Sequence, residues 1–180
     1  MSLAHNHHHH AHGDLTKKAA IASVSMALFL LALKIFAAAE TGSVALLGSL
    51  ADTAFDVLAS LLTLFSVRYA AMPADDDHRF GHGKAEALSA LLQVILVTVS
   101  AILIAWRAIV RFGHQAPTDH PEYGIGVSII AIITTLGLLA YQRYVVLKTG
   151  SVAIQADHVH YQSDLLLNIA VIIAILLDTM

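Results

Sequence analysis

The chain has 180 residues, of which 57% are hydrophobic and 13% charged, and it has no cysteine and a formal net charge of −3. This composition is too apolar for an ordinary soluble domain, and the lack of cysteine excludes disulfides, thiolate metal sites and thiol catalysis. The small negative charge gives no sign of a nucleic-acid partner. We therefore expect an all-α, polytopic membrane helix bundle.

The first 16 residues form a histidine-rich segment, with six histidines between His5 and His12. We expect it to be a disordered tail on the cytoplasmic side, because its composition is polar and biased. It could buffer or deliver metal, and it could equally belong to a purification tag. The sequence assigns no specific site to it.

Residues 17–180 are expected to form the transmembrane domain. A helix needs about 20 mostly apolar residues to cross a bilayer. Five segments meet this requirement, at about 19–39, 44–67, 85–109, 123–141 and 152–177. A buried soluble bundle is the alternative, but nearly all of its helices would have to be apolar all round.

Basic residues predict the orientation of these segments. With the N-terminus in the cytoplasm, seven of the ten lysines and arginines fall on the inner side, in agreement with the positive-inside rule. These seven are Lys17, Lys18, Arg68, Arg79, Lys84, Arg143 and Lys148. The outer segment 113–122 contains no lysine or arginine.

The second apolar segment contains two carboxylates one helical turn apart, Asp52 and Asp56. Residues at i and i+4 share one face of a helix. A charge inside a bilayer is costly and usually functional. This pair is therefore a candidate for ligands of a cation.

The connection that follows contains Asp75, His78 and His82. On one helical turn, or in a loop bent at Gly81, these three side chains could share a cation. A solvated acidic loop that precedes a helix is the alternative, and the spacing alone does not choose between the two.

The fifth apolar segment contains His160 and Asp164, again four residues apart. Asp157 precedes His160 by three residues, so it shares their face and is a candidate relay or a carboxylate at the inner mouth. Asn168 lies one turn beyond Asp164 and could support the ligands from outside the first coordination sphere. Ser49 is a candidate for the same role.

A short block is repeated at a fixed offset of 108 residues. Residues 41–45 and 149–153 have the identical sequence Thr-Gly-Ser-Val-Ala, and the same offset relates Asp52 to His160 and Asp56 to Asp164. The second and fifth segments would cross the membrane in opposite directions. This predicts an inverted repeat with a site at its interface. Coincidence among small residues, which are common in membrane helices, is the alternative.

Together, the paired residues of the two segments predict a divalent-metal site. Carboxylate oxygens and imidazole nitrogens at about 2.0–2.2 Å suit tetrahedral Zn²⁺. They also accept Fe²⁺, Mn²⁺, Co²⁺ or Cd²⁺, and geometry then decides selectivity. The alternative is a set of buried polar groups that are protonated or hydrogen-bonded to one another. The predicted ligands are Asp52, Asp56, His160 and Asp164.

Three sequence features resemble the cation diffusion facilitator family, and most closely its bacterial zinc and iron efflux branch. They are the Asp52-x-x-x-Asp56 pair, the stretch from Pro73 to Glu86, and the string His160-Tyr-Gln-Ser-Asp164. The resemblance implies a homodimeric antiporter of the bacterial inner membrane that exports a divalent cation in exchange for protons.

The same resemblance assigns roles to individual residues. Asp52, Asp56, His160 and Asp164 match the transport site of the family, and Asp75, His78 and His82 match its second site in the cytoplasmic loop. Family members continue into a sixth helix and a soluble cytoplasmic domain. We therefore expect this chain to stop before the sixth helix, with the C-terminal soluble domain absent, and homodimer formation to belong to the full-length protein.

We expect a secondary transporter rather than an enzyme, with Zn²⁺ or Fe²⁺ as transported substrate and protons as counter-ions. An intramembrane metalloenzyme would need a general base, and the chain has no His-Glu-x-x-His string. Two alternatives stay open. One is a membrane metal-binding fragment without transport, and the other is a proton-coupled carrier of a non-metal substrate.

Overall fold

The structure is a computed structural model. It describes the backbone of residues 3–42, 44–76, 78–111 and 121–178, and the side chains of 13–42, 49–76, 78–106, 109–110 and 123–173. All regular structure in these ranges is α-helical, which confirms the predicted all-α class. The five helices are α1 (Leu3–Thr41), α2 (Val44–Ala70), α3 (Lys84–Arg111), α4 (Pro121–Thr149) and α5 (Val152–Asp178).

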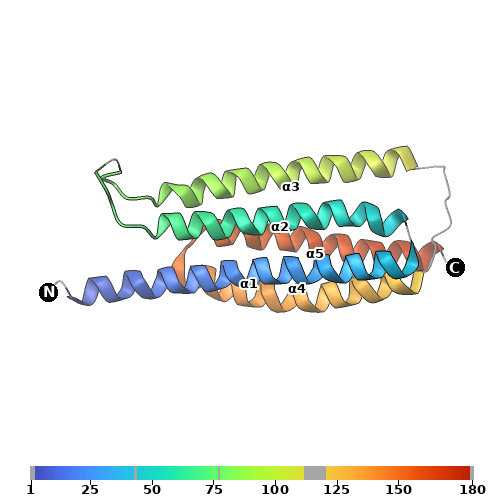
Figure 1. Cartoon of the computed structure of the whole chain (residues 1–180), viewed down its shortest axis with the longest axis horizontal. Coiled ribbons are helices and arrows are strands. Elements are labelled where there is room, and N and C mark those ends of the chain that lie inside the picture. Colours follow the sequence, from blue (N-terminus) through green and yellow to red (C-terminus); the bar gives the residue numbers. More distant parts are fainter. Residues whose placement is uncertain (1–2, 43, 77, 112–120, 179–180) are drawn as a thin grey trace.

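The helices lie side by side in one long bundle, and successive helices run in opposite directions (Figure 1). α1 packs against α2 and α4, and α5 packs against α4 and α3. α3 lies along one edge of the bundle, where it touches α2 and α5. The 71–83 connection and the α4–α5 turn lie at the same end of the bundle as the N-terminus (Figure 1).

Two helices are longer than their apolar segments. α1 begins at Leu3, so the expectation of a disordered histidine-rich tail was wrong for the backbone of this segment. The segment has no proline and only one glycine, Gly13, so a helix nucleated in the apolar part can extend through it. α4 continues to Thr149, eight residues beyond the predicted end, because helical hydrogen bonding does not stop where hydropathy falls.

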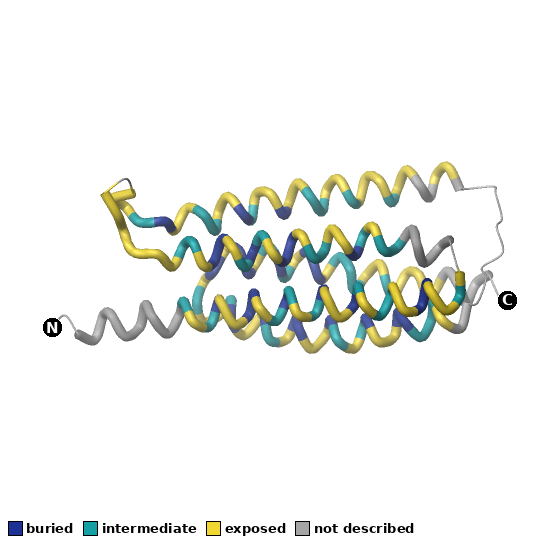
Figure 2. The backbone as a smooth tube through the Cα atoms, viewed as in Figure 1, coloured by how far each residue is buried: buried dark blue, intermediate teal, exposed yellow. Residues whose placement is uncertain are grey.

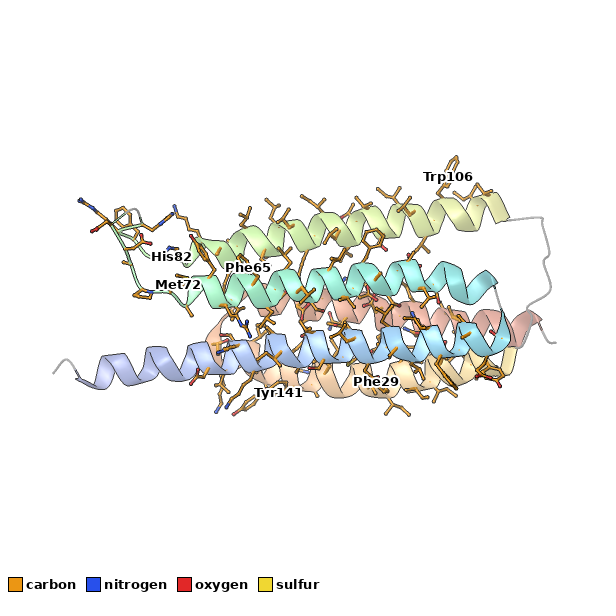
Figure 3. All side chains as sticks on the ribbon, viewed as in Figure 1. Phe29, Phe65, Met72, His82, Trp106 and Tyr141 are labelled. Atoms are coloured by element: carbon orange, nitrogen blue, oxygen red, sulfur yellow. The ribbon has the colours of Figure 1, made fainter. Side chains whose placement is uncertain are left out.

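The distribution of buried and exposed residue types in the bundle is the reverse of that in a soluble protein. The buried positions are mostly small or polar, whereas large apolar side chains such as Phe65, Trp106 and Leu147 are exposed. Figure 2 shows exposed residues along all five helices, and Figure 3 shows apolar side chains projecting outward from the bundle. Small interior residues and an apolar exterior are typical of helices packed within a bilayer.

Four helices are long and apolar enough to cross a membrane, namely Gly13–Thr41, Ser49–Ala70, Lys84–Trp106 and Tyr123–Thr149. The described part of α5 is not apolar enough over a sufficient length to be counted with these four. Its first half contains two aspartates and two histidines, and its apolar end from residue 174 onward lies outside the described side chains. The fifth membrane crossing therefore stays a prediction.

The glycines of the repeated block end the preceding helix in the same way at both positions. Gly42 and Gly150 have φ values of +64° and +66°, the left-handed conformation that favours glycine after a helix. Their N–H groups donate to the carbonyls of Ala38 and Val146 at 2.9 and 2.8 Å, which closes α1 and α4. The helices that follow, α2 and α5, run in opposite directions (Figure 1), as the predicted inverted repeat requires.

At the second turn, α3 helps to begin α5. Ser151 precedes the helix, and its Oγ accepts a hydrogen bond from the N–H of Ile154 at 3.3 Å. That hydroxyl donates to Glu86 of α3 at 2.7 Å, and the Glu86 carboxylate also accepts from the N–H of Ala153 at 3.5 Å. A carboxylate at a helix N-terminus is favoured by the exposed N–H groups there. This contact fixes α5 relative to α3.

Candidate metal centre

Side chains from α2 and α5 converge inside the bundle. Asp56, His160 and Asp164 each offer one ligand atom, and these atoms lie within 4.8 Å of one another. His160 is buried, and both carboxylates are half-buried. Since α2 and α5 are the two helices that follow the repeated turns, the inverted repeat itself brings these residues together.

The imidazole of His160 is the centre of this group. Its Nε2 atom lies 3.2 Å from Oδ1 of Asp56 and 3.5 Å from Oδ2 of Asp164. Two ligands that bind one zinc at 2.0–2.2 Å in a tetrahedron are separated by about 3.3–3.6 Å. The observed separations therefore match two edges of such a tetrahedron.

Asp52, the fourth predicted ligand, is not a member of this close group. It is half-buried and lies one turn before Asp56 on the same helix. A one-turn separation keeps both residues on one face, so Asp52 borders the group without joining it.

A lysine inside the first apolar segment reaches toward the same region. Lys34 of α1 donates a hydrogen bond to Oγ1 of Thr53, which is 1% exposed, at 2.5 Å. Thr53 in turn donates to the carbonyl of Ser49 at 3.2 Å. The side chain of Lys34 is thus held by the residue that follows Asp52.

The three candidate supporting residues have different surroundings. Asn168 donates to the backbone carbonyl of Asp164 at 2.8 Å, so it contacts the ligand's main chain and not its carboxylate. The backbone carbonyl of Ser49 accepts a hydrogen bond from the hydroxyl of Thr53, the residue that follows Asp52. Asp157 is fully buried and accepts hydrogen bonds from Gln93 and Gln142.

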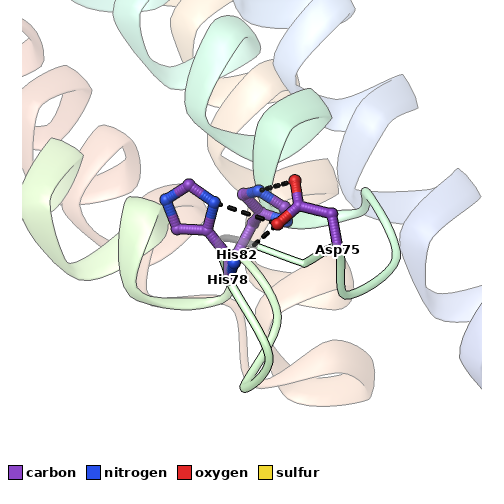
Figure 4. A group of neighbouring side chains, drawn as sticks. All are labelled: Asp75, His78 and His82. Atoms are coloured by element: carbon purple, nitrogen blue, oxygen red, sulfur yellow. Dashed lines mark hydrogen bonds and ion pairs between the residues drawn. The ribbon is translucent and has the colours of Figure 1, made fainter.

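The second predicted group also comes together, in the connection between α2 and α3 (Figure 4). Nδ1 of His78 lies 3.1 Å from Oδ1 of Asp75, and Nε2 of His82 lies 3.5 Å from Oδ2 of the same carboxylate. Gly81 adopts a φ of +76°, so the loop is bent at the residue that the sequence indicated. One carboxylate thus faces two imidazoles.

Local hydrogen bonds hold this loop group in shape. The backbone N–H of His78 donates to Asp75 Oδ1 at 2.6 Å, and this bond lowers the pKa of the Asp75 carboxyl below its usual range. The side chain of His82 is only 2% exposed and meets the Tyr69 ring edge-on, with centroids 4.5 Å apart. The group therefore has one anchored imidazole, whereas Asp75 and His78 are exposed.

Sequence reasoning missed the partners of Asp157 and the contact of Lys34. Gln93 and Gln142 belong to none of the motifs that predicted ligands. A glutamine within a long apolar segment, such as Gln93, is itself a signal, because polar groups at membrane depth require partners. Lys34 carried the same signal.

Comparison with known proteins identifies a family domain and several relatives of the chain. Residues 20–180 match the cation efflux transmembrane domain. Proteins described as cation-efflux pump FieF from Salmonella arizonae, Salmonella newport and Salmonella typhimurium are each 48% identical to the chain over 164 residues. The aligned region is 91% of this chain and 55% of each relative, so the chain spans about half the length of these proteins.

Proposed function

Because the chain belongs to the cation efflux family, also called the cation diffusion facilitators, we propose that it moves a divalent metal cation across the membrane in exchange for protons. The family is one of transporters and not of enzymes. The single observation that carries the proposal is the position of His160 Nε2 between the carboxylates of Asp56 and Asp164, at tetrahedral-edge distances.

We assign the transport site to Asp56, His160 and Asp164, with Asp52 as the fourth ligand. Asp52 lies one turn from Asp56, so a small rotation or shift of α2 would bring it to a metal bound by the other three. Carboxylates buried in a bundle are stabilised by a bound cation, which offsets their burial cost. The cargo that suits this ligand set is Zn²⁺ or Fe²⁺, with Cd²⁺, Co²⁺ and Mn²⁺ as further candidates.

Protons and metal would compete for the same atoms of the transport site. A histidine must be neutral and a carboxylate ionised to bind a metal, so metal binding releases protons. His160 suits this exchange, because imidazole changes its charge near physiological pH. Protons from the outer side would then displace the metal after the inverted halves rock against each other.

The loop group would be a second metal site. Asp75, His78 and His82 supply one carboxylate and two imidazoles at the end of the bundle that we assign to the cytoplasm. Its location suits the capture of metal before transport. We further propose that the full-length protein is a homodimer in the bacterial inner membrane with a cytoplasmic N-terminus, as expected from the family resemblance and the positive-inside pattern.

Zinc and iron uptake into proteoliposomes, with a pH gradient imposed, tests the proposed function. Metal flux should be coupled to opposite proton flux, and Asp56→Ala should abolish both. Asp14→Asn, which removes an exposed carboxylate outside the site, should leave both unchanged. Metal binding without flux would identify a membrane metal-binding fragment instead. Proton flux that needs no metal would favour a carrier of a non-metal substrate.

A further inference from the structure

A carboxylate that is not among the proposed metal ligands is completely buried in the bundle. Asp157 of α5 is 0% exposed. Nε2 of Gln142 donates to its Oδ2 at 2.7 Å, and Nε2 of Gln93 donates to its Oδ1 at 3.3 Å. Both donors are neutral amides, so the hydrogen bonds bring no positive charge to the carboxylate.

These contacts extend to all five helices. The Gln142 amide also donates to Ser23 Oγ of α1 at 3.0 Å, and the Gln93 amide also donates to Thr63 Oγ1 of α2. We call this set the five-helix polar cluster, and each helix contributes one member to it. The members are Ser23, Thr63, Gln93, Gln142 and Asp157.

The members of the cluster from α1 to α4 are neutral. The ionisable groups that interact with Asp157 lie on its own helix, and they are His160, Tyr161 and Asp164. An ionised carboxylate buried among neutral groups is expensive unless a cation compensates it. When no metal is bound, binding of a proton removes this cost.

The cluster contains acceptors that a proton on Asp157 would use. The Oε1 atoms of Gln93 and Gln142 are buried and have no hydrogen-bond partner among the described residues. Rotation of either amide by 180° would present its oxygen to Asp157, and a protonated carboxyl could then donate to it. The cluster thus supports two arrangements, one with Asp157 ionised and amide N–H groups facing it, the other with Asp157 protonated.

We propose that Asp157 is a proton-binding site distinct from the metal ligands, occupied while the metal group is empty and vacated when a divalent cation binds there. The proposal rests on the proposed function of the metal group. On metal binding the O–H bond of Asp157 breaks, the proton passes to water, and the carboxylate regains the two amide hydrogen bonds.

Two features couple Asp157 to the metal. His160 is one turn away on the same helix, so a divalent charge beside it favours the ionised carboxylate. By linkage, a proton on Asp157 weakens metal binding to the same extent that metal weakens proton binding. Since the cluster joins all five helices, the change of protonation also changes hydrogen bonds between α5 and its neighbours α3 and α4.

Proton release during zinc binding tests this inference without requiring transport. Calorimetric titration of the purified chain in buffers of different ionisation enthalpy gives the number of protons released per zinc bound. In Asp157→Asn, which keeps the shape of the side chain and, like the protonated carboxyl, can both donate and accept a hydrogen bond, this number should fall by about 0.5–1 proton near neutral pH. Zinc stoichiometry should stay the same. Asp14→Asn, the matched change at an exposed carboxylate, should release as many protons as wild type.

An unchanged proton number in Asp157→Asn would overturn the inference. If Asp157→Asn does not fold, infrared difference spectra of wild type and Asp157→Glu decide the question. Zinc should remove a protonated-carboxyl band, and that band should be displaced in Asp157→Glu; an absent or undisplaced band overturns the inference. Asp56→Ala separates the two proposals, because zinc binding that survives it contradicts the metal assignment, whatever Asp157 does.

Discussion

Nε2 of His160 lies 3.2 Å from Oδ1 of Asp56, and this contact joins the two helices that follow the repeated Thr-Gly-Ser-Val-Ala block. The block ends α1 and α4 with the same left-handed glycine and starts α2 and α5 in opposite directions. The metal-capable side chains then occur at matching positions after each turn. The geometry of the candidate site is therefore a consequence of the repeat.

Zinc affinity at the Asp56, His160 and Asp164 group should rise with pH between about pH 6 and 8, because the imidazole must lose its proton to bind metal. The affinity should change by up to about tenfold per pH unit for each proton displaced. Titrations of the His78→Ala variant at several pH values would isolate this group from the loop. A flat affinity over this range would exclude competition between protons and metal.

The loop group should lose zinc affinity on acidification through its histidines and not through Asp75. The pKa of Asp75 is lowered, so this carboxylate stays ionised as the pH falls toward its ordinary range and protonates only below it. In the Asp56→Ala background, loop binding should therefore weaken as histidines gain protons, and Asp75→Asn should weaken it at every pH. A midpoint in the carboxyl range for the loop with Asp75, which disappears in Asp75→Asn, would contradict this expectation.

Gly81→Ala should weaken metal binding by the loop. The added Cβ meets no atom within 4 Å, but the φ of +76° is strained for alanine. The left-handed conformation costs a non-glycine residue about 1–2 kcal/mol, which corresponds to roughly a five- to thirtyfold loss of affinity if the bound loop needs that bend. Gly83→Ala is the matched control, since Gly83 also has open space and no positive φ. Equal affinities in both variants would show that the bend is dispensable.

Gly42→Ala and Gly150→Ala should destabilise the bundle by similar amounts, about 1–2 kcal/mol each, because both glycines adopt the left-handed conformation in open space. Gly137→Ala, at an exposed helical position with equal space, should be neutral or stabilising. Thermal unfolding in detergent measures all three. A large difference between Gly42→Ala and Gly150→Ala would mean that the two turns are not energetically equivalent.

Replacing Lys34 by methionine should tighten zinc binding by several-fold. Its amino group is held by Thr53, the residue that follows Asp52, and a positive charge at this position repels an incoming cation. Lys34→Arg keeps the charge and serves as the control. Binding that weakens in Lys34→Met would show that the lysine mainly holds α1 against α2.

The helices and the metal group could be predicted from the sequence because their signals are local. Apolar length located all five helices, and the four-residue spacing placed His160 and Asp164 on one face. The repeat at an offset of 108 residues then predicted that Asp56 would belong to the same site. Sequence spacing could not show that Asp52 stays outside the close group, because that depends on the rotation of α2.

The five-helix polar cluster could not be predicted in the same way. Gln93 and Asp157 are 64 residues apart, and Gln142 lies 15 residues before Asp157 on another helix. None of these pairs follows a helical spacing, and their contacts depend on how α3, α4 and α5 pack. The prediction for the N-terminal part of α1 was also wrong. The histidine-rich composition indicates disorder, whereas extension of the helix to Leu3 depends on the neighbouring apolar segment.

Titration of Zn²⁺ into the purified chain and its Asp56→Ala variant tests the central claim most directly. Both proteins should carry alanine at the six N-terminal histidines, so that this segment contributes no binding. We predict that Asp56→Ala loses one zinc per chain and keeps the helical content of the wild type. Zinc binding of unchanged stoichiometry and affinity would contradict the assignment and leave Asp75, His78 and His82 as the metal site.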